Sequence, residues 1–85
     1  MRLPEMVLDL HGLSVEEALY TLEQFLNKAF QDGLYKIWVI HGKGTGIMRQ
    51  AVTDYLKGHP LVISFSTADP HHGGNGATEV KINEW

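Results

Sequence analysis

The fold of this 85-residue chain is decided by residues 14–40, which read SVEEALYTLEQFLNKAFQDGLYKIWVI. The first half of this stretch carries apolar side chains at the three- and four-residue spacing of an amphipathic helix. Ser14, followed three residues later by Glu17, has the spacing of a capping box, and Gly33 supplies the left-handed residue that often ends a helix. Residues 35–40 are a nearly continuous apolar run, typical of a strand inside a sheet. A helix followed directly by a buried strand is therefore predicted.

The flanking segments predict a second helix and three more strands. We expect a strand at residues 6–10 before the first helix, and a second helix at 47–57 after the buried strand. Alternating apolar and polar residues predict strands at 61–67 and 77–82. Strand-helix-strand crossovers are right-handed in nearly all proteins, so the order β-α-β-α-β-β places both helices on one face of the sheet. The predicted fold class is α/β, an α+β two-layer sandwich with a four-stranded mixed sheet, in one domain spanning 1–85.

The composition is that of a globular domain with little net charge. Hydrophobic residues make up 44% of the chain and charged residues 20%, which separates it from disordered and fibrous proteins. The absence of cysteine excludes disulfides, thiolate nucleophiles and cysteine-based zinc sites, and favours a cytoplasmic location. No apolar run is long enough for a membrane span, so no membrane partner is expected. A formal charge of -3 means that any nucleic acid must be bound by a local patch.

A glycine-rich stretch, HGKGTG at residues 41–46, separates the buried strand from the second helix. Its three glycines let backbone N–H groups approach an anion, and the helix N-terminus adds partial positive charge, which suits a phosphate. Single residues separate the glycines, so the spacing matches no nucleotide-binding fingerprint and no nucleotide cofactor is expected. The alternative is a turn required only by chain geometry. Lys43 and Arg49 favour the anion site, although Arg49 has its own alternatives, solvation or a bridge to an acid such as Asp9.

Histidines follow both predicted parallel strands. Asp9 and His11 lie two residues apart in DLHG, which predicts one shared strand face, and His41 ends the second strand. Carboxyl ends of parallel strands meet at one edge of a sheet, so we expect these side chains to gather there with the loop DPHHGGNG, residues 69–76. A carboxylate and two imidazoles beside a phosphate-binding loop are suited to acid-base catalysis on a phosphodiester. Structural hydrogen bonds to nearby backbone are the alternative for the Asp9 and His11 pair.

No sequence-local spacing of metal ligands is present, so the metal ligands stay undetermined. His71 and His72 are adjacent and point in different directions on an extended chain. A transient Mg²⁺ or Mn²⁺, held by Asp9, Glu79 or a substrate phosphate, is compatible with the sequence.

Trp38 has two interpretations. It shares strand parity with Lys36 and Ile40, so it could lie on the helix-free face as a stacking platform for an unpaired base. We expect the other arrangement, burial or partial burial in the core against a helix.

Three segments, LDLHGLSVEEAL at 8–19, HGKGTGIMRQAV at 41–52 and GGNGATEV at 73–80, resemble the Smr (small MutS-related) domain along almost the whole chain. The resemblance is greatest to the C-terminal Smr domain of bacterial MutS-family proteins of the second type. Met48 stands where leucine is common. The resemblance implies a fold like the C-terminal domain of translation initiation factor 3, and a chain of this size is compatible with a piece of a larger protein.

The resemblance implies an endonuclease, typically a nicking one, acting on branched or structured DNA in recombination and repair control. RNA cleavage in ribosome rescue, a non-catalytic module that binds nucleic acid or the ribosome, and a domain that contacts only protein are the alternatives. Carried over by position, the catalytic residues are Asp9, His11 and His41. We expect His11 or His41 to assist proton transfer. The nucleic-acid-binding residues are carried over as Gly42, Lys43, Gly44, Thr45, Gly46, Arg49, Gly74 and Gly76.

Overall fold

A computed structural model describes residues 6–83 and confirms the predicted order of elements. The strands and helices are β1 (Val7–Asp9), α1 (Val15–Gln31), β2 (Lys36–Ile40), α2 (Ile47–Leu56), β3 (Val62–Thr67) and β4 (Ala77–Ile82). Two single-turn 3₁₀ helices, η2 (Pro70–His72) and η3 (Gly74–Gly76), lie within the loop before β4. Neither helix of the described part is long and apolar enough to cross a membrane.

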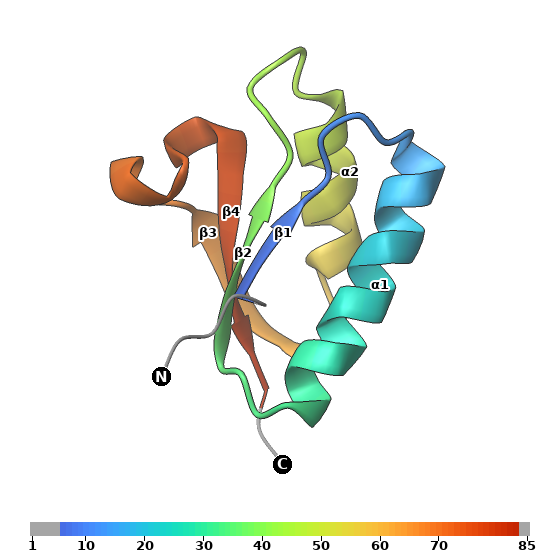
Figure 1. The fold of residues 1–85 in the computed structure, drawn as a ribbon, viewed down its shortest axis with the longest axis vertical. Helices are drawn as coiled ribbons and strands as arrows, with labels where there is room; N and C mark the ends of the chain where they lie inside the picture. Colours follow the sequence, from blue (N-terminus) through green and yellow to red (C-terminus); the bar gives the residue numbers. More distant parts are fainter. Residues whose placement is uncertain (1–5, 84–85) are drawn as a thin grey trace.

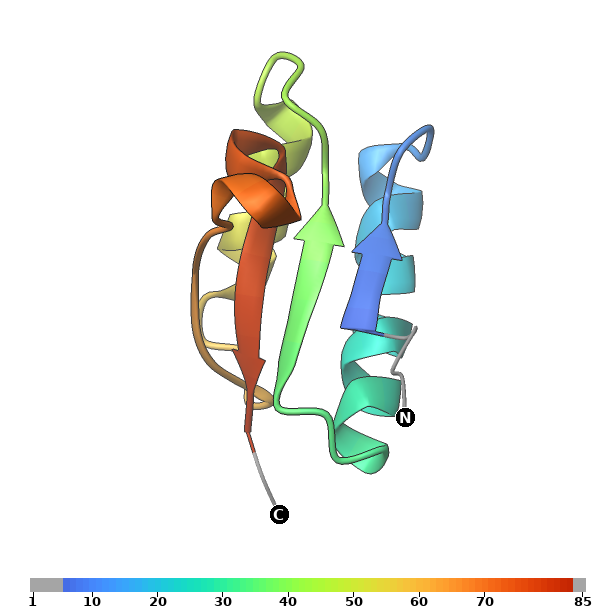
Figure 2. The ribbon, with the colours of Figure 1, turned by 60° about the vertical axis from the view of Figure 1, so that its left-hand side comes forward.

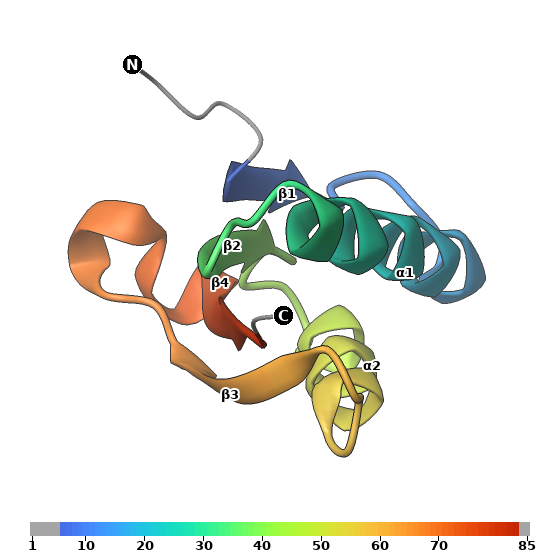
Figure 3. The same ribbon diagram turned by 90° about the horizontal axis from the view of Figure 1, so that it is seen from below.

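The four strands form one mixed sheet in the order β1-β2-β4-β3. β1 runs parallel to β2, while β4 is antiparallel to both β2 and β3 (Figure 2). The carboxyl ends of β1, β2 and β3 therefore meet at the edge of the sheet where β4 begins. Both helices pack on one face of this sheet, and the two 3₁₀ turns project from the other (Figures 1 and 3).

Helix α1 begins and ends where the sequence signals place it. The Ser14 hydroxyl accepts a hydrogen bond from the Glu17 N–H at 3.1 Å, and the Glu17 carboxylate accepts one from the Ser14 N–H at 3.0 Å. This capping box satisfies donors that a helix start otherwise leaves unbonded. Gly33, with φ of 76°, turns the chain out of the helix. The buried stripe of α1 consists of Ala18, Leu22, Leu26 and Ala29.

The core lies between the helices and one face of the sheet. On β2, Ile37 and Val39 are fully buried in that core, which leaves Lys36, Trp38 and Ile40 on the helix-free face. The expectation that Trp38 packs against a helix is therefore wrong. Partial burial is confirmed, because Trp38 is half-buried on the opposite face.

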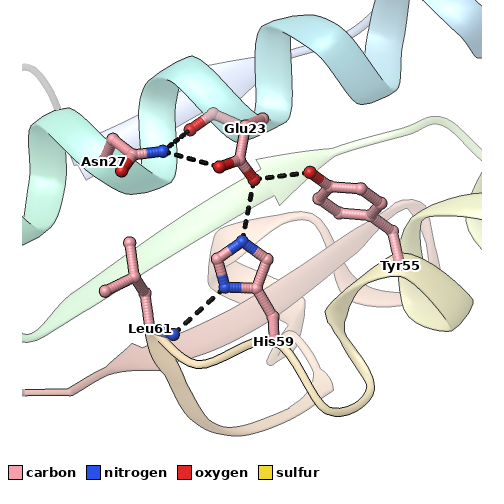
Figure 4. Close-up of polar contacts among 5 residues, drawn as sticks. All are labelled: Glu23, Asn27, Tyr55, His59 and Leu61. Carbon is pink, nitrogen blue, oxygen red and sulfur yellow. Dashed lines mark hydrogen bonds and ion pairs between the residues drawn. The ribbon is translucent and has the colours of Figure 1, made fainter.

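A polar cluster joins the two helices to the segment that precedes β3 (Figure 4). The Glu23 carboxylate accepts hydrogen bonds from the Tyr55 hydroxyl at 2.5 Å, the His59 Nε2–H at 2.8 Å and the Asn27 amide at 2.8 Å. The Leu61 N–H donates to Nδ1 of His59 at 3.1 Å. Because Nδ1 accepts that bond, the ring proton belongs on Nε2, and a neutral His59 satisfies both contacts. We call Glu23, Asn27, Tyr55 and His59 the Glu23 cluster.

The hydrogen bonds of the cluster change the acidity of its members. The bonds from Tyr55, His59 and Asn27 lower the pKa of Glu23 to about 2. Burial, with the bond to Glu23 adding to it, raises the pKa of Tyr55 to about 12. The carboxylate and the phenol therefore keep these protonation states across the neutral range, and the cluster holds α1 against α2 there.

Candidate nucleic-acid interface

Three loops meet at the edge of the sheet where β1, β2 and β3 end. They are the turn after β1, the 41–46 loop after β2 and the segment between β3 and β4, and all three lie at the upper end of Figure 1. The prediction that these segments share one edge of the sheet is thus confirmed, while no described contact joins the Asp9 or His11 side chain to His41 or to residues 69–76.

The 41–46 loop is anchored to η3 through one carbonyl group. The N–H groups of His41 and Gly42 both donate to the Gly76 carbonyl, each at 2.9 Å. Gly76 is buried, and a Cβ at this position would lie 3.3 Å from Cγ of Lys43 and 3.6 Å from the carbonyl carbon of Gly42. Close packing of the two loops explains a residue without a side chain here.

His41 is held inside the protein as part of this anchor. Its side chain lies beneath the loop with only 9% of the residue exposed. Nδ1 lies 3.1 Å from the Gly42 carbonyl, which can only accept, so Nδ1 carries the proton. Nε2 then accepts from the Thr78 hydroxyl at 2.8 Å. Burial lowers the pKa of His41, the Gly42 contact opposes this, and the charge of Arg49 lowers it further. A neutral ring with both nitrogens engaged results.

The rest of the 41–46 loop has donors without acceptors. Within the described chain, the backbone N–H groups of residues 43–46 form no hydrogen bond to a protein group. Helix α2 follows directly, with Gly46 as its N-cap at φ of 89° and no side-chain cap. The Ile47 N–H reaches only the Thr45 hydroxyl, at 3.4 Å. This combination of unbonded donors and a helix N-terminus is suited to binding an anion.

Two cations flank these donors. Lys43 and Arg49 are both exposed, and the Arg49 guanidinium donates to the Thr67 hydroxyl of β3 at 3.1 Å. No carboxylate of residues 6–83 forms an ion pair with either side chain, so the alternative of a bridge from Arg49 to Asp9 is not seen. The local charge is therefore positive, although the chain as a whole is acidic.

Two grooves open beside the loop. One has a volume of about 510 Å³ and is lined by Lys43, Ala68, Pro70, Gly73, Gly74 and Asn75. The other, of about 580 Å³, runs between α2 and β3 and is lined by Thr45, Gly46, Arg49, Gln50, Thr53, Lys57 and Phe65. Each groove contains at least one cation, which favours a negatively charged ligand in either.

Asp9 and His11 form a local turn and not a strand pair. The Asp9 carboxylate accepts the His11 N–H at 2.8 Å, which is the structural bond that the alternative interpretation predicts. The prediction of a shared strand face is wrong, because β1 ends at Asp9 and the chain turns at Gly12, with φ of 82°. The His11 side chain is exposed, and its ring forms no hydrogen bond to the described residues.

No preformed metal centre is found in the described part of the chain. Across residues 6–83, no three His, Asp or Glu side chains lie close enough together to hold an ion. Glu79 instead lies 3.7 Å from the Lys36 ammonium, and His72 lies 2.9 Å from the Asp69 carboxylate.

Two contacts near the site were missed by sequence reasoning. The bond between His41 and Thr78 joins residues 37 positions apart, and Trp38 stacks on His72 from a separate loop. No residue spacing signals either contact, because each depends on the register of β2 and β4 and on the path of the loop.

Comparisons with known proteins agree with this architecture. Residues 8–83 match the family model described as the Smr domain. The chain is 51% identical over 73 residues to Endonuclease MutS2 of Thermomicrobium roseum, covering 86% of the chain and 9% of that protein. The chain thus spans about a tenth of the length of the curated relatives it matches.

Two solved structures share the fold. The Smr domain of Thermus thermophilus MutS2 superimposes with a TM-score of 0.87 at 43% identity, covering 91% of this chain and 96% of that one. YdaL, a stand-alone small MutS-related protein from Escherichia coli, gives a TM-score of 0.91 at 34% identity, covering 96% and 67%. With the family model matching nearly its whole length, this chain belongs to the Smr domain family.

Proposed function

We propose that this domain binds nucleic acid through the 41–46 loop and nicks one of its phosphodiester bonds. The observation that carries the proposal is the set of unbonded N–H groups at residues 43–46, between the exposed cations Lys43 and Arg49. A phosphate accepts several such donors at once, and the dipole of α2 favours its negative charge.

The same groups are suited to the chemical step. During cleavage, negative charge accumulates on the phosphorane-like transition state, and fixed donors and cations stabilise it. His11 is exposed with an unbonded ring, so we assign it the proton transfer. His41 has both ring nitrogens engaged, so we assign it the role of holding the loop in shape. Asp9 acts through the turn that positions His11.

A divalent ion would depend on the substrate for part of its coordination. The described residues offer no three-ligand cluster, so the protein alone does not fit a resident metal, and no step is assigned to one. If Mg²⁺ or Mn²⁺ is required, Asp9 and a substrate phosphate are the groups that would share it, because Mg²⁺ usually keeps several of its waters.

DNA is the proposed substrate, in a branched or structured form and in a cytoplasmic repair or recombination setting. The support is similarity to proteins named Endonuclease MutS2, most of whose length lies outside the matched region. Further domains of a larger protein would then take part in choosing the substrate. Structured RNA carries the same phosphates and is the alternative substrate.

A non-catalytic module that binds nucleic acid or the ribosome is the second candidate. Two observations favour it, the structural bond that engages the Asp9 carboxylate and the formal charge of -3. Both candidates use the 41–46 loop, and they differ in whether His11 and the groups around it take part in cleavage.

Nicking of supercoiled plasmid and of a structured RNA, with Mg²⁺, Mn²⁺ or EDTA, tests the proposal. His11→Ala should reduce cleavage about 100- to 10,000-fold while binding is kept. Lys43→Ala should weaken binding and reduce its dependence on salt. Lys28→Ala, which removes an exposed lysine of α1 paired with Asp32, is the matched control and should change neither.

The outcomes separate the candidates. Salt-sensitive binding that is weakened by Lys43→Ala, with no cleavage under any metal condition, would establish the binding module. A wild-type domain that binds neither DNA nor RNA would refute both candidates.

A further inference from the structure

A third groove lies on the helix-free face of the sheet. It has a volume of about 340 Å³ and is lined by Val7, Trp38, Ile40, His71, His72 and Gly73. Figure 3 shows the 3₁₀ segment that supplies the histidines on the side of the sheet away from α1 and α2. The groove is of a size that takes small planar ligands.

One wall of the groove is an aromatic stack. The rings of Trp38 and His72 lie 4.3 Å apart between centroids and only 7° from parallel. His72 is held in this position by Asp69, whose carboxylate oxygens lie 2.9 and 3.0 Å from Nδ1. The His72 side chain remains 44% exposed. A flat π surface is therefore held in place and stays open to solvent, which suits stacking with another flat ring.

Trp38 also has an unsatisfied donor. Its Nε1–H is buried and has no acceptor among residues 6–83. A buried N–H without a partner is unfavourable, and tryptophan usually finds an acceptor when buried. Because the atom is covered, an acceptor from a ligand can reach it only after the groups that cover it shift.

The groove adjoins the proposed cleavage edge. Val7 of β1 pairs with Trp38, and Asp9 pairs with Ile40, so all four lie on the same face. Two residues along a strand cover about 7 Å, a distance that one or two nucleotides span. A base in the groove would thus place a neighbouring phosphate at the turn that carries Asp9 and His11.

Cations lie on the same face. The Lys36 ammonium is 5.9 Å from the centre of the Trp38 ring, and Lys81 pairs in register with Lys36. Glu79 neutralises part of this charge through its contact with Lys36 at 3.7 Å. Two lysines and one carboxylate therefore lie together on this part of the face, while the Asp69 carboxylate lies beside His72.

We propose that this groove binds one unpaired nucleobase of the substrate, stacked on the exposed side of the His72 ring, which itself stacks on Trp38, next to the phosphate to be cleaved. This inference rests on the proposed function and specifies its substrate. A fully paired duplex has no unpaired base to place in the groove. The preferred substrates are then nucleic acids that contain a gap, a flap or a junction.

The test compares a duplex that contains a short single-stranded gap with the fully paired duplex of the same sequence, in DNA and in RNA. A Trp85→Phe background leaves Trp38 as the sole tryptophan. His72→Ala and Trp38→Leu should each weaken binding of the gapped duplex about 5- to 100-fold, while the affinity for paired duplex stays the same. Tyr20→Ala, which removes an aromatic ring that is 70% exposed on α1, is the matched control.

Fluorescence supplies a readout that a folding defect does not mimic. Gapped duplex should quench Trp38, and the same duplex with abasic sites in the gap should not. Unchanged affinity in both groove variants, or equal losses for gapped and paired duplex, would overturn the inference.

Failure of the inference can be told apart from failure of the proposed function. If Lys43→Ala weakens binding while gapped and paired duplexes bind equally well, only the groove proposal falls. If the wild type binds neither substrate, both fall.

Discussion

The Glu23 cluster and the 41–46 loop use polar groups in opposite ways. In the cluster, the Glu23 carboxylate accepts from Tyr55, His59 and Asn27, and the second nitrogen of His59 accepts from Leu61. In the loop, the N–H groups of residues 43–46 have no acceptor in the described chain, and the adjacent Lys43 has no counter-ion there. The polar groups of the Glu23 cluster are satisfied within the protein, whereas the N–H groups of the 41–46 loop need an acceptor from outside it.

One histidine from each region and a third, His11 of the turn after β1, show what the difference teaches. In both His41 and His59, the two ring nitrogens form hydrogen bonds within the protein. These bonds hold the neighbouring loops and helices in place. The exposed His11 ring is not engaged in this way. The hydrogen bonds of His41 and His59 thus give these two rings a structural role that their position in the sequence does not reveal.

The largest expected effect is on stability, and it comes from the Glu23 cluster. Glu23→Ala should lower the free energy of unfolding by about 2 to 3 kcal/mol, because Tyr55 and His59 lose the acceptor for partly buried donors. Lys43→Ala should change it by less than about 0.5 kcal/mol, because the exposed side chain forms no hydrogen bond or ion pair with the described residues. Urea unfolding measures both, and similar losses in the two variants would remove the distinction between the regions.

A smaller effect is expected in acid. The pKa of Glu23 is lowered in the folded state from 4.5 to about 2, so its stabilisation is complete above pH 4.5 and is lost as the pH falls through about 2. The Glu23 side chain is 37% exposed, so solvent screening reduces the contribution to about 1 to 2 kcal/mol.

The Glu23→Gln variant isolates this contribution. Its free energy of unfolding should depend less on pH between 4.5 and 2 than that of the wild type, as followed by urea unfolding at a series of pH values. Parallel pH profiles for the two proteins would show that another carboxylate is responsible.

Sequence reasoning succeeded where the controlling interactions are local. The capping box of Ser14 and Glu17, the turn at Gly33 and the continuous apolar run of β2 each involve neighbours in the chain, and all are confirmed. The bond from Asp9 to the His11 N–H, anticipated as an alternative, spans only two residues. Such features depend on short-range geometry that a sequence displays directly.

The missed features depend on distant packing. Tyr55 and His59 lie 32 and 36 positions from Glu23 and meet it only because α1 packs beside α2. Trp38 was expected against a helix, although its strand parity also allowed the opposite face, and its stack on His72 brings together segments that are distant in the chain. The chemical roles of Asp9, His11 and His41 stay predictions, because they depend on a substrate.

The smallest expected effect comes from the 41–46 loop. Inorganic phosphate at several times its Kd should raise the free energy of unfolding of the wild type by about 1 kcal/mol, because the folded 41–46 loop binds the anion and the unfolded chain does not. Phosphate also stabilises proteins generally by exclusion from their surface. The comparison among variants separates binding at the loop from this general effect. Lys28→Ala and Glu23→Gln should show the full increase, and Lys43→Ala should show only the general part, measured by urea unfolding at constant ionic strength. An equal increase in all four proteins would mean that the unbonded N–H groups of residues 43–46 do not form an anion site, and the contrast between the two regions would then lie in stability alone.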